Sequence, residues 1–119
     1  MRSRETPEHQ MVARWLDAHP CIHWLHVPGG GFRGDRAQAM RTGRYLKSLG
    51  AKAGAPDILI FSAPPRISGM VGCAIEMKSP TGRLQKNQKA FLANLSVCGW
   101  HTLVCHSAAE AVRKLIQAG

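Results

Sequence analysis

Acidic residues are scarce in this sequence. Its 119 residues include seven Asp and Glu against sixteen Lys and Arg, so the formal net charge is +9 at pH 7. Two long stretches, residues 36–52 and 77–109, contain no acid but nine basic side chains between them. Such stretches favour a polyanion as partner. A solvated face that only aids solubility is the usual explanation for an isolated charge run.

Long apolar runs are also missing. No run approaches the roughly 20 residues that a membrane-spanning helix needs, and the first residues, with Arg2, Arg4, Glu5 and Glu8, lack the apolar region of a secretory signal. No internal repeat or linker divides the chain. We therefore expect a single domain over residues 1–119, no membrane partner and a cytoplasmic location.

The four cysteines lack the paired spacing of a metal site. None forms Cys-x-x-Cys, and all four fall in runs typical of strand or helix interiors, which predicts reduced, buried thiols rather than two disulfides. Zinc is an alternative because Cys98, His101 and Cys105 have ligand-like separations. A strand over residues 100–106 would put His106 on the opposite face from His101 and Cys105, which argues against zinc.

A P-loop is absent as well. Residues 28–34 contain four glycines in six positions, but no Gly-Lys-Ser/Thr follows them. We expect this loop to contact a nucleic-acid backbone or to move over the site, and the alternative is an ordinary mobile turn.

Hydrophobic spacing and capping residues predict the element order α, β, α, β, β, α, β, α. A mixed sheet flanked by helices, in the α/β class, follows from this order. The first three expected elements are a helix over residues 7–18 capped by Thr6, a strand over 21–27 and a helix over 36–49 closed by Gly50. Two strands follow, over 57–61 and 71–78, and then a helix whose inward face carries Leu84, Phe91, Leu92 and Leu95. The last two elements are a strand over 100–105 and a helix that opens with a capping box at 107–110 and buries Ala111, Val112, Leu115 and Ile116.

Two of the predicted strands carry carboxylates at their polar ends. If residues 57–61 and 71–78 form an antiparallel hairpin that turns around residues 64–69, Asp57 faces Glu76. Two adjacent carboxylates are tolerated when a divalent cation lies between them or when one is protonated. Oxygen-only ligands suit Mg²⁺ or Mn²⁺.

Lys78 follows Glu76 by two residues, so both side chains project from the same face of the strand. A lysine therefore lies beside the candidate metal site. The alternative for this pair is an exposed cross-strand ion pair of about 0 to 1 kcal/mol.

The run Gly54-Ala55-Pro56-Asp57, followed by Glu76-Met77-Lys78 and then Gln88, resembles the PD-(D/E)XK nucleases, in particular their virus-type replication-repair nuclease (VRR-NUC) branch. The resemblance spans nearly the whole chain, from Glu8 to the strand after Gln88, with Ala55 where a branched apolar residue is common. It implies a restriction-endonuclease-like core.

The same resemblance implies roles for individual residues. Asp57 and Glu76, with the main-chain carbonyl of Met77, would hold Mg²⁺ or Mn²⁺, and Lys78 would aid the attacking water. Gln88 and Glu8 would complete the site, with Glu8 as a candidate further metal ligand. For Glu8 the alternative is a first-turn glutamate favoured by the helix dipole, and for Gln88 it is a core glutamine bonded to the backbone.

The implied function is metal-dependent hydrolysis of DNA phosphodiester bonds, on branched DNA such as four-way junctions, by a homodimer that acts in DNA repair in a bacterial or phage-infected cell. Three of the seven acids, Glu8, Asp57 and Glu76, fall in the site, which strengthens the case for a polyanion partner. Two alternatives stay open, a non-catalytic DNA-binding module or nuclease subunit and an RNA endonuclease. The residues expected to contact nucleic acid are Arg33, Arg36, Arg41, Arg44, Lys47, Lys52, Arg83, Lys86 and Lys89.

Overall fold

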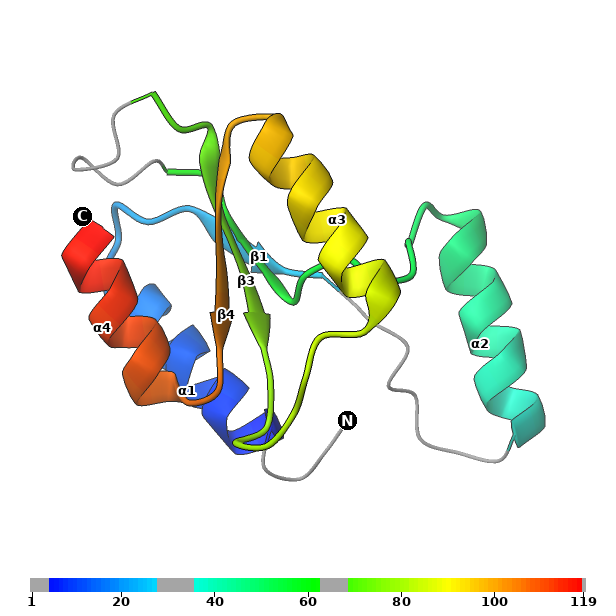
Figure 1. The fold of residues 1–119 in the computed structure, drawn as a ribbon. Coiled ribbons are helices and arrows are strands. Elements are labelled where there is room, and N and C mark those ends of the chain that lie inside the picture. Colours follow the sequence, from blue (N-terminus) through cyan, green and yellow to red (C-terminus); the bar gives the residue numbers. More distant parts are fainter. Residues whose placement is uncertain (1–4, 28–35, 63–68, 119) are drawn as a thin grey trace.

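The computed structural model describes residues 5–27, 36–62 and 69–118 of the chain (Figure 1). The order of elements along the chain is the predicted one. The helices are α1 (Glu5–Asp17), α2 (Arg36–Ser48), α3 (Lys86–Val97) and α4 (Ala108–Ala118), and the strands are β1 (Trp24–His26), β2 (Ile58–Ile60), β3 (Gly72–Met77) and β4 (Trp100–Cys105).

The four strands form one mixed sheet in the order β1-β2-β3-β4. The β1–β2 and β2–β3 pairs are antiparallel, and the β3–β4 pair is parallel. Helices α1 and α4 lie side by side on one face of the sheet and α3 covers the other, while α2 stands apart beyond α3 (Figure 1). The prediction of an α/β fold with a mixed sheet between helices is confirmed.

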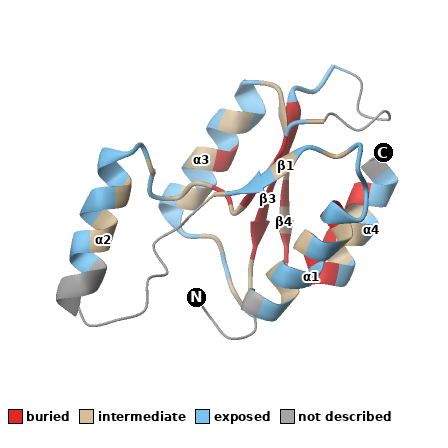
Figure 2. Ribbon diagram, turned by 180° about the vertical axis from the view of Figure 1, so that it is seen from behind, coloured by how far each residue is buried: buried red, intermediate tan, exposed pale blue. Residues whose placement is uncertain are grey.

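Strand β3 is the centre of the core. All six of its residues are buried (Figure 2), because it has a strand on each side and helices over both faces, the setting in which a strand reads as a nearly continuous apolar run. Ile58 and Ile60 of β2 pack beside it. Val12 and Leu16 of α1, with Ala111 and Leu115 of α4, close the core from one face.

Several boundaries differ from the predicted ones. Helix α1 begins at Glu5, so Thr6 lies inside its first turn and is not its cap. Pro7 is tolerated there because first-turn N–H groups have no intrahelical partner. Helix α3 begins at Lys86, which leaves Leu84 outside it. In α4, Ile116 is 58 % exposed, because the helix presents Ala111 and Leu115 to the sheet.

Two expectations fall on residues that the structure does not describe. The glycine-rich loop at 28–34, with Arg33, lies outside the described ranges, and so does most of the predicted hairpin turn. In the described part of the chain, no helix is long and apolar enough to cross a membrane.

The cysteines divide into two buried and two exposed thiols. Cys73 and Cys105 are buried in adjacent strands, whereas Cys21 and Cys98 are exposed, and all four are free. The expectation of buried thiols was therefore wrong for Cys21 and Cys98, which lie at element ends rather than inside them. Within the described residues, no group of three or more His, Cys, Asp and Glu side chains is arranged to hold a metal ion, so the zinc alternative gains no support.

The difference in burial predicts which of the four thiols react quickly with a thiol reagent. Burial raises the pKa of Cys73 to about 12 and that of Cys105 to about 11, so both stay protonated and shielded near pH 8, where a thiol reagent attacks thiolates. We expect two fast equivalents per native chain and four after denaturation. Cys98→Ser should remove one fast equivalent and Cys73→Ser none; a native chain that gives more than two would contradict the burial of this pair.

Candidate active site

The β2–β3 register brings the two predicted carboxylates to neighbouring positions. Ile58 pairs with Ile75, so the next residues outward are Asp57, just before β2, and Glu76, near the end of β3. The Asp57 side chain reaches across to β3, where its Oδ2 accepts a hydrogen bond of 2.8 Å from the Met77 N–H. This is the register that the hairpin prediction required.

Asp57 is also held from the other side, by β1. Its main-chain carbonyl accepts hydrogen bonds from the Val27 N–H at 2.8 Å and from His26 Nδ1 at 3.0 Å. A carbonyl only accepts, so His26 carries its proton on Nδ1. Strand contacts on both sides therefore fix the position of Asp57.

Glu76 is the one buried charged residue in the described part of the chain, at 4 % exposure. Gln88 Nε2 donates to its Oε2 at 3.2 Å, and Lys78 Nζ lies 3.6 Å from the same oxygen. The Lys78 and Glu76 side chains are 11 % and 6 % exposed. The alternative of an exposed ion pair is therefore wrong: these charges are shielded from water, where each depends strongly on the other.

Gln88 joins the start of α3 to this carboxylate. Its Oε1 accepts a hydrogen bond of 2.8 Å from the Gln85 N–H, while its NH₂ group donates to Glu76. These two contacts fix which end of the amide faces the site. The Gln88 amide thus has a carboxylate partner at one end and, at the other, the backbone partner that the alternative required.

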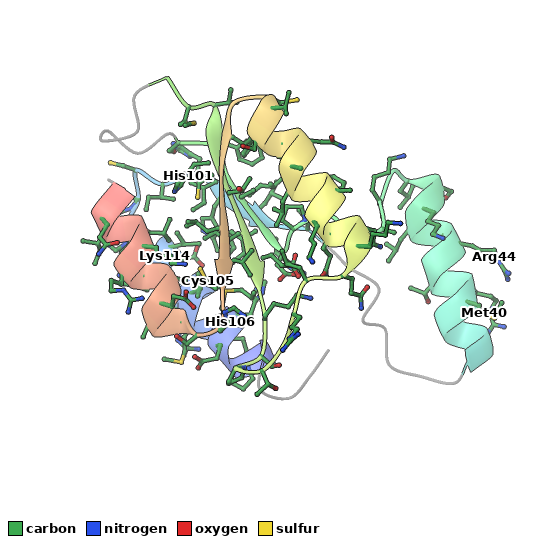
Figure 3. The ribbon with its side chains drawn as sticks, in the orientation of Figure 1. Met40, Arg44, His101, Cys105, His106 and Lys114 are labelled. Atoms are coloured by element: carbon green, nitrogen blue, oxygen red, sulfur yellow. The ribbon has the colours of Figure 1, made fainter. Side chains whose placement is uncertain are left out.

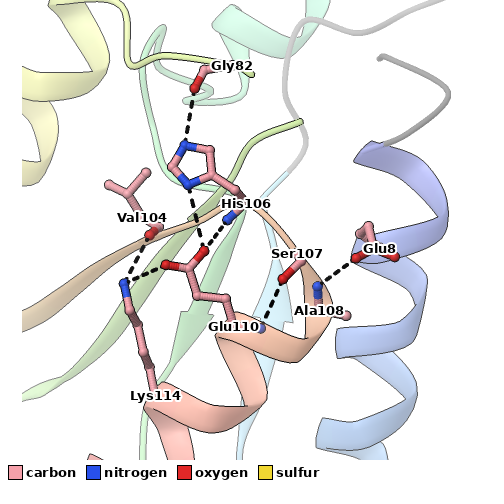
Figure 4. Close-up of polar contacts among 8 residues, drawn as sticks. All are labelled: Glu8, Gly82, Val104, His106, Ser107, Ala108, Glu110 and Lys114. Carbon is pink, nitrogen blue, oxygen red and sulfur yellow. Dashed lines mark hydrogen bonds and ion pairs between the residues drawn. The ribbon is translucent and has the colours of Figure 1, made fainter. Parts of the chain in front are cut away.

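Glu8 lies on α1 and contacts the first residue of α4. Its Oε1 accepts a hydrogen bond of 2.9 Å from the Ala108 N–H (Figure 4). A carboxylate is favourable at a helix N-terminus because of the free N–H groups and the helix dipole. Glu8 therefore interacts with the dipole of α4, through the N–H of its first residue. Because α4 follows β4, whose Cys105 pairs with Met77, Glu8 lies at the Glu76 end of the sheet; its role toward a metal stays a prediction.

Two histidines beside Asp57 were missed by the sequence analysis. The rings of His9 and His26 meet edge to face at 4.7 Å. Burial and then His26 lower the pKa of His9, against a smaller opposing effect of Asp57. His9 Nδ1 is the one buried side-chain nitrogen or oxygen without a hydrogen-bond partner among the described residues. The only available signal was the position of His9 next to Glu8.

The donor set fits a hard divalent cation. Asp57 and Glu76 offer carboxylate oxygens and Met77 a carbonyl at one end of the sheet, and the described residues provide no larger cluster of ligating side chains. Mg²⁺ is usually held by one or two carboxylates, with waters and substrate phosphates completing its shell. The pair of carboxylates matches that requirement.

The segment that follows Lys52 lies against the start of α3. Gly54, with φ of 85°, touches the first turn of α3, where an added Cβ would lie 2.7 Å from the Asn87 oxygen. Gly54 is thus needed for this contact, because any side chain there would meet the Asn87 backbone. The contact brings the segment of Lys52 beside the helix that carries Lys86. The segment just after the first acid-free stretch therefore meets the second stretch.

Most of the expected nucleic-acid contacts are exposed. On α2, Arg41, Arg44 and Lys47 recur every three residues, and Arg44 points away from the rest of the molecule (Figure 3). Arg33 lies outside the described residues, and only the backbone of Arg36 is described. The exposed members are Arg41, Arg44, Lys47, Lys52, Arg83, Lys86 and Lys89.

The chain belongs to the VRR-NUC domain family, a family of nucleases, because the family model matches residues 4–109. A solved structure described as a VRR_NUC domain protein has the same fold, with a TM-score of 0.74 over 99 % of this chain and 89 % of that chain at 20 % sequence identity. A search of curated proteins finds no match.

The hydrogen bond of Glu8 predicts that substitutions can separate its effect on stability from any effect on metal binding. Glu8→Ala should lower the free energy of unfolding by about 1 kcal/mol, because the Ala108 N–H loses its acceptor, while Glu8→Gln keeps an oxygen there and should lose much less. Denaturant titration measures both. Equal losses would contradict the capping role. If Glu8 also binds metal, Glu8→Gln should weaken Mn²⁺ binding in calorimetry while leaving stability nearly intact.

Proposed function

We propose that this protein is a Mg²⁺- or Mn²⁺-dependent DNA endonuclease that cleaves branched DNA such as four-way junctions. The observation that carries the proposal is the convergence of Asp57, Glu76, Lys78 and Gln88 at one end of the sheet, with Glu76 buried between the lysine and the glutamine. Membership of a nuclease family supports the same reaction class.

Each residue has a defined task in this proposal. Asp57, Glu76 and the Met77 carbonyl would hold the cation, which when bound polarises the scissile phosphate and activates water. Lys78 would orient the attacking water and offset the negative charge that builds on the phosphate in the transition state. Gln88 would keep the Glu76 carboxylate in a single orientation, since its own amide is fixed by Gln85.

The exposed basic residues would bind the phosphate backbone. Contact between the Gly54 segment and Asn87 brings Lys52 and Lys86 onto neighbouring segments. Helix α2, which carries further exposed basic residues, lies beyond α3 (Figure 1). Such contacts supply affinity that is independent of sequence and falls with salt. Phosphate contacts do not distinguish DNA from RNA, so the sugar preference requires experiment.

The central test removes the Lys78 charge and keeps its apolar stem. Lys78→Met should reduce the Mg²⁺-dependent cleavage rate by roughly 100-fold or more, because the transition state loses a preorganised cation. Cleavage would be measured in Mg²⁺ and in Mn²⁺ on single-stranded, duplex, flap and four-way DNA and on matched RNA. Arg14→Ala, which removes an exposed charge from α1, is the matched control, and thermal unfolding checks that both variants fold.

The outcomes of this test are distinct. Undiminished cleavage by Lys78→Met, with contaminating nuclease excluded, would remove the lysine from the mechanism. Tight DNA binding with no metal-dependent cleavage by the wild-type protein would favour a binding module over an enzyme. Preferential cleavage of the matched RNA would replace DNA as the substrate.

A junction-resolving activity also predicts an oligomeric state. A four-way junction needs two cuts related by symmetry, and a two-fold homodimer provides two such sites. We expect light scattering to give twice the 13.0 kDa chain mass at working concentration. A monomer would contradict the paired cut but leave the hydrolytic chemistry unaffected.

A further inference from the structure

His106 connects the end of β4 to the segment between two proposed active-site residues. Its Nε2 lies 3.1 Å from the carbonyl oxygen of Gly82 (Figure 4). Because a carbonyl only accepts, Nε2 must carry the proton in this contact. Gly82 belongs to residues 79–85, which join Lys78, just after β3, to the helix that carries Gln88. The His106 imidazole is therefore hydrogen-bonded to the segment that connects Lys78 with Gln88.

Helix α4 holds His106 in place from its other side. Glu110 Oε1 accepts a hydrogen bond of 2.7 Å from the His106 main-chain N–H and lies 3.7 Å from its Nδ1. Lys114 Nζ lies 2.9 Å from Glu110 Oε2 (Figure 4). The hydrogen bond from His106 and then Lys114 hold the pKa of Glu110 below its ordinary value, so this carboxylate is ionised at neutral pH.

The Glu110 side chain departs from an ordinary capping box. Ser107 Oγ accepts the Glu110 N–H at 3.0 Å, as the sequence predicts, but the glutamate reaches the N–H of His106 instead of that of Ser107. In a capping box the glutamate would bond the cap residue itself. Glu110 therefore holds the backbone of the residue whose side chain meets Gly82.

Gly82 in turn lies against the lysine. A Cβ at Gly82 would lie 3.4 Å from Lys78 Cβ and 3.0 Å from Ser79 Oγ, and the Gly82 N–H donates to the Ser79 carbonyl at 2.9 Å. The Lys78 N–H is bonded to the Cys105 carbonyl at 2.8 Å, beside His106. Movement of Gly82 would therefore change the packing around the stem of Lys78 and the path toward Gln88.

We propose that His106 is a positioning residue for the nuclease site: by holding Gly82, it fixes the 79–85 segment and so sets where Lys78 and Gln88 meet Glu76. The catalytic part of this inference rests on the proposed function; the structural part does not. His106 itself lies outside the reacting groups, so its loss should slow turnover without weakening DNA binding.

A matched set of substitutions isolates the Nε2 bond. In His106→Gln the amide nitrogen reaches the place of Nε2, in His106→Asn it reaches only that of Nδ1, and in His106→Ala no donor remains. Hydrogen exchange at the Gly82 amide, measured without DNA or metal, should speed up roughly tenfold in the Asn and Ala variants, because loss of the bond at the Gly82 carbonyl loosens the turn in which this N–H donates to Ser79. It should stay near wild type in the Gln variant. His101→Ala, at the opposite end of β4 (Figure 3), should leave it unchanged.

Turnover is measured on the same variants. We expect kcat to fall at least fivefold in the Asn and Ala variants with KM unchanged, and the Gln variant to restore most of it. Unchanged exchange of the Gly82 amide in His106→Ala would overturn the inference. A wild-type kcat in a variant whose Gly82 amide exchanges faster would overturn it as well. If the wild-type protein cleaves no nucleic acid, the proposed function fails, while the exchange pattern still decides whether His106 holds the segment.

Discussion

A carboxylate buried in the core is the constraint on which the rest of this structure depends. Glu76 lies at the end of the central strand, almost without access to water, where an uncompensated charge is costly and removal of a buried partner typically costs about 3–5 kcal/mol. The chain supplies Lys78 and Gln88 to one of its oxygens. It also sets Asp57, a second carboxylate, on the adjacent strand. Carboxylate oxygens from two adjacent strands are the kind of ligand that a hard divalent cation takes.

The fold holds this group through contacts between segments that are distant in sequence. Strand pairing fixes Asp57 relative to Glu76, and the amide of Gln88 ties the first turn of α3 to β3. The corner between β4 and α4 receives Glu8 from α1 and bonds the 79–85 segment through His106. The site is thus supported by every layer of the sandwich. Basic residues remain at the surface, where they can meet phosphates without disturbing the buried charges.

Features that depend on local chain pattern could be predicted from the sequence. Strand alternation puts Glu76 and Lys78 on one face, and the hairpin fixes the register that brings Asp57 beside Glu76. The position of Gln88 among apolar residues predicts a fixed partner. The element order follows from the spacing of apolar residues together with caps such as Ser107 and Gly50.

Features that depend on tertiary contacts could not be predicted in this way. The bond between Glu8 and Ala108 spans 100 residues, and nothing near Glu8 in the sequence identifies its partner. Gly54 is needed because Asn87 approaches it closely, a fact invisible in the glycine itself. The exposure of Ile116 depends on how α4 is rotated against the sheet, and the roles of His106 and His9 depend on neighbours from other elements.

We propose that Asp57 and Glu76 hold a divalent cation between them. Anomalous diffraction from crystals grown with Mn²⁺ tests it most directly, because the manganese position is seen without any assay of activity. We expect a strong peak about 2.0–2.4 Å from a carboxylate oxygen of each residue and near the Met77 carbonyl. A well-ordered site with no such peak, or with the two carboxylates turned away from each other, would contradict it.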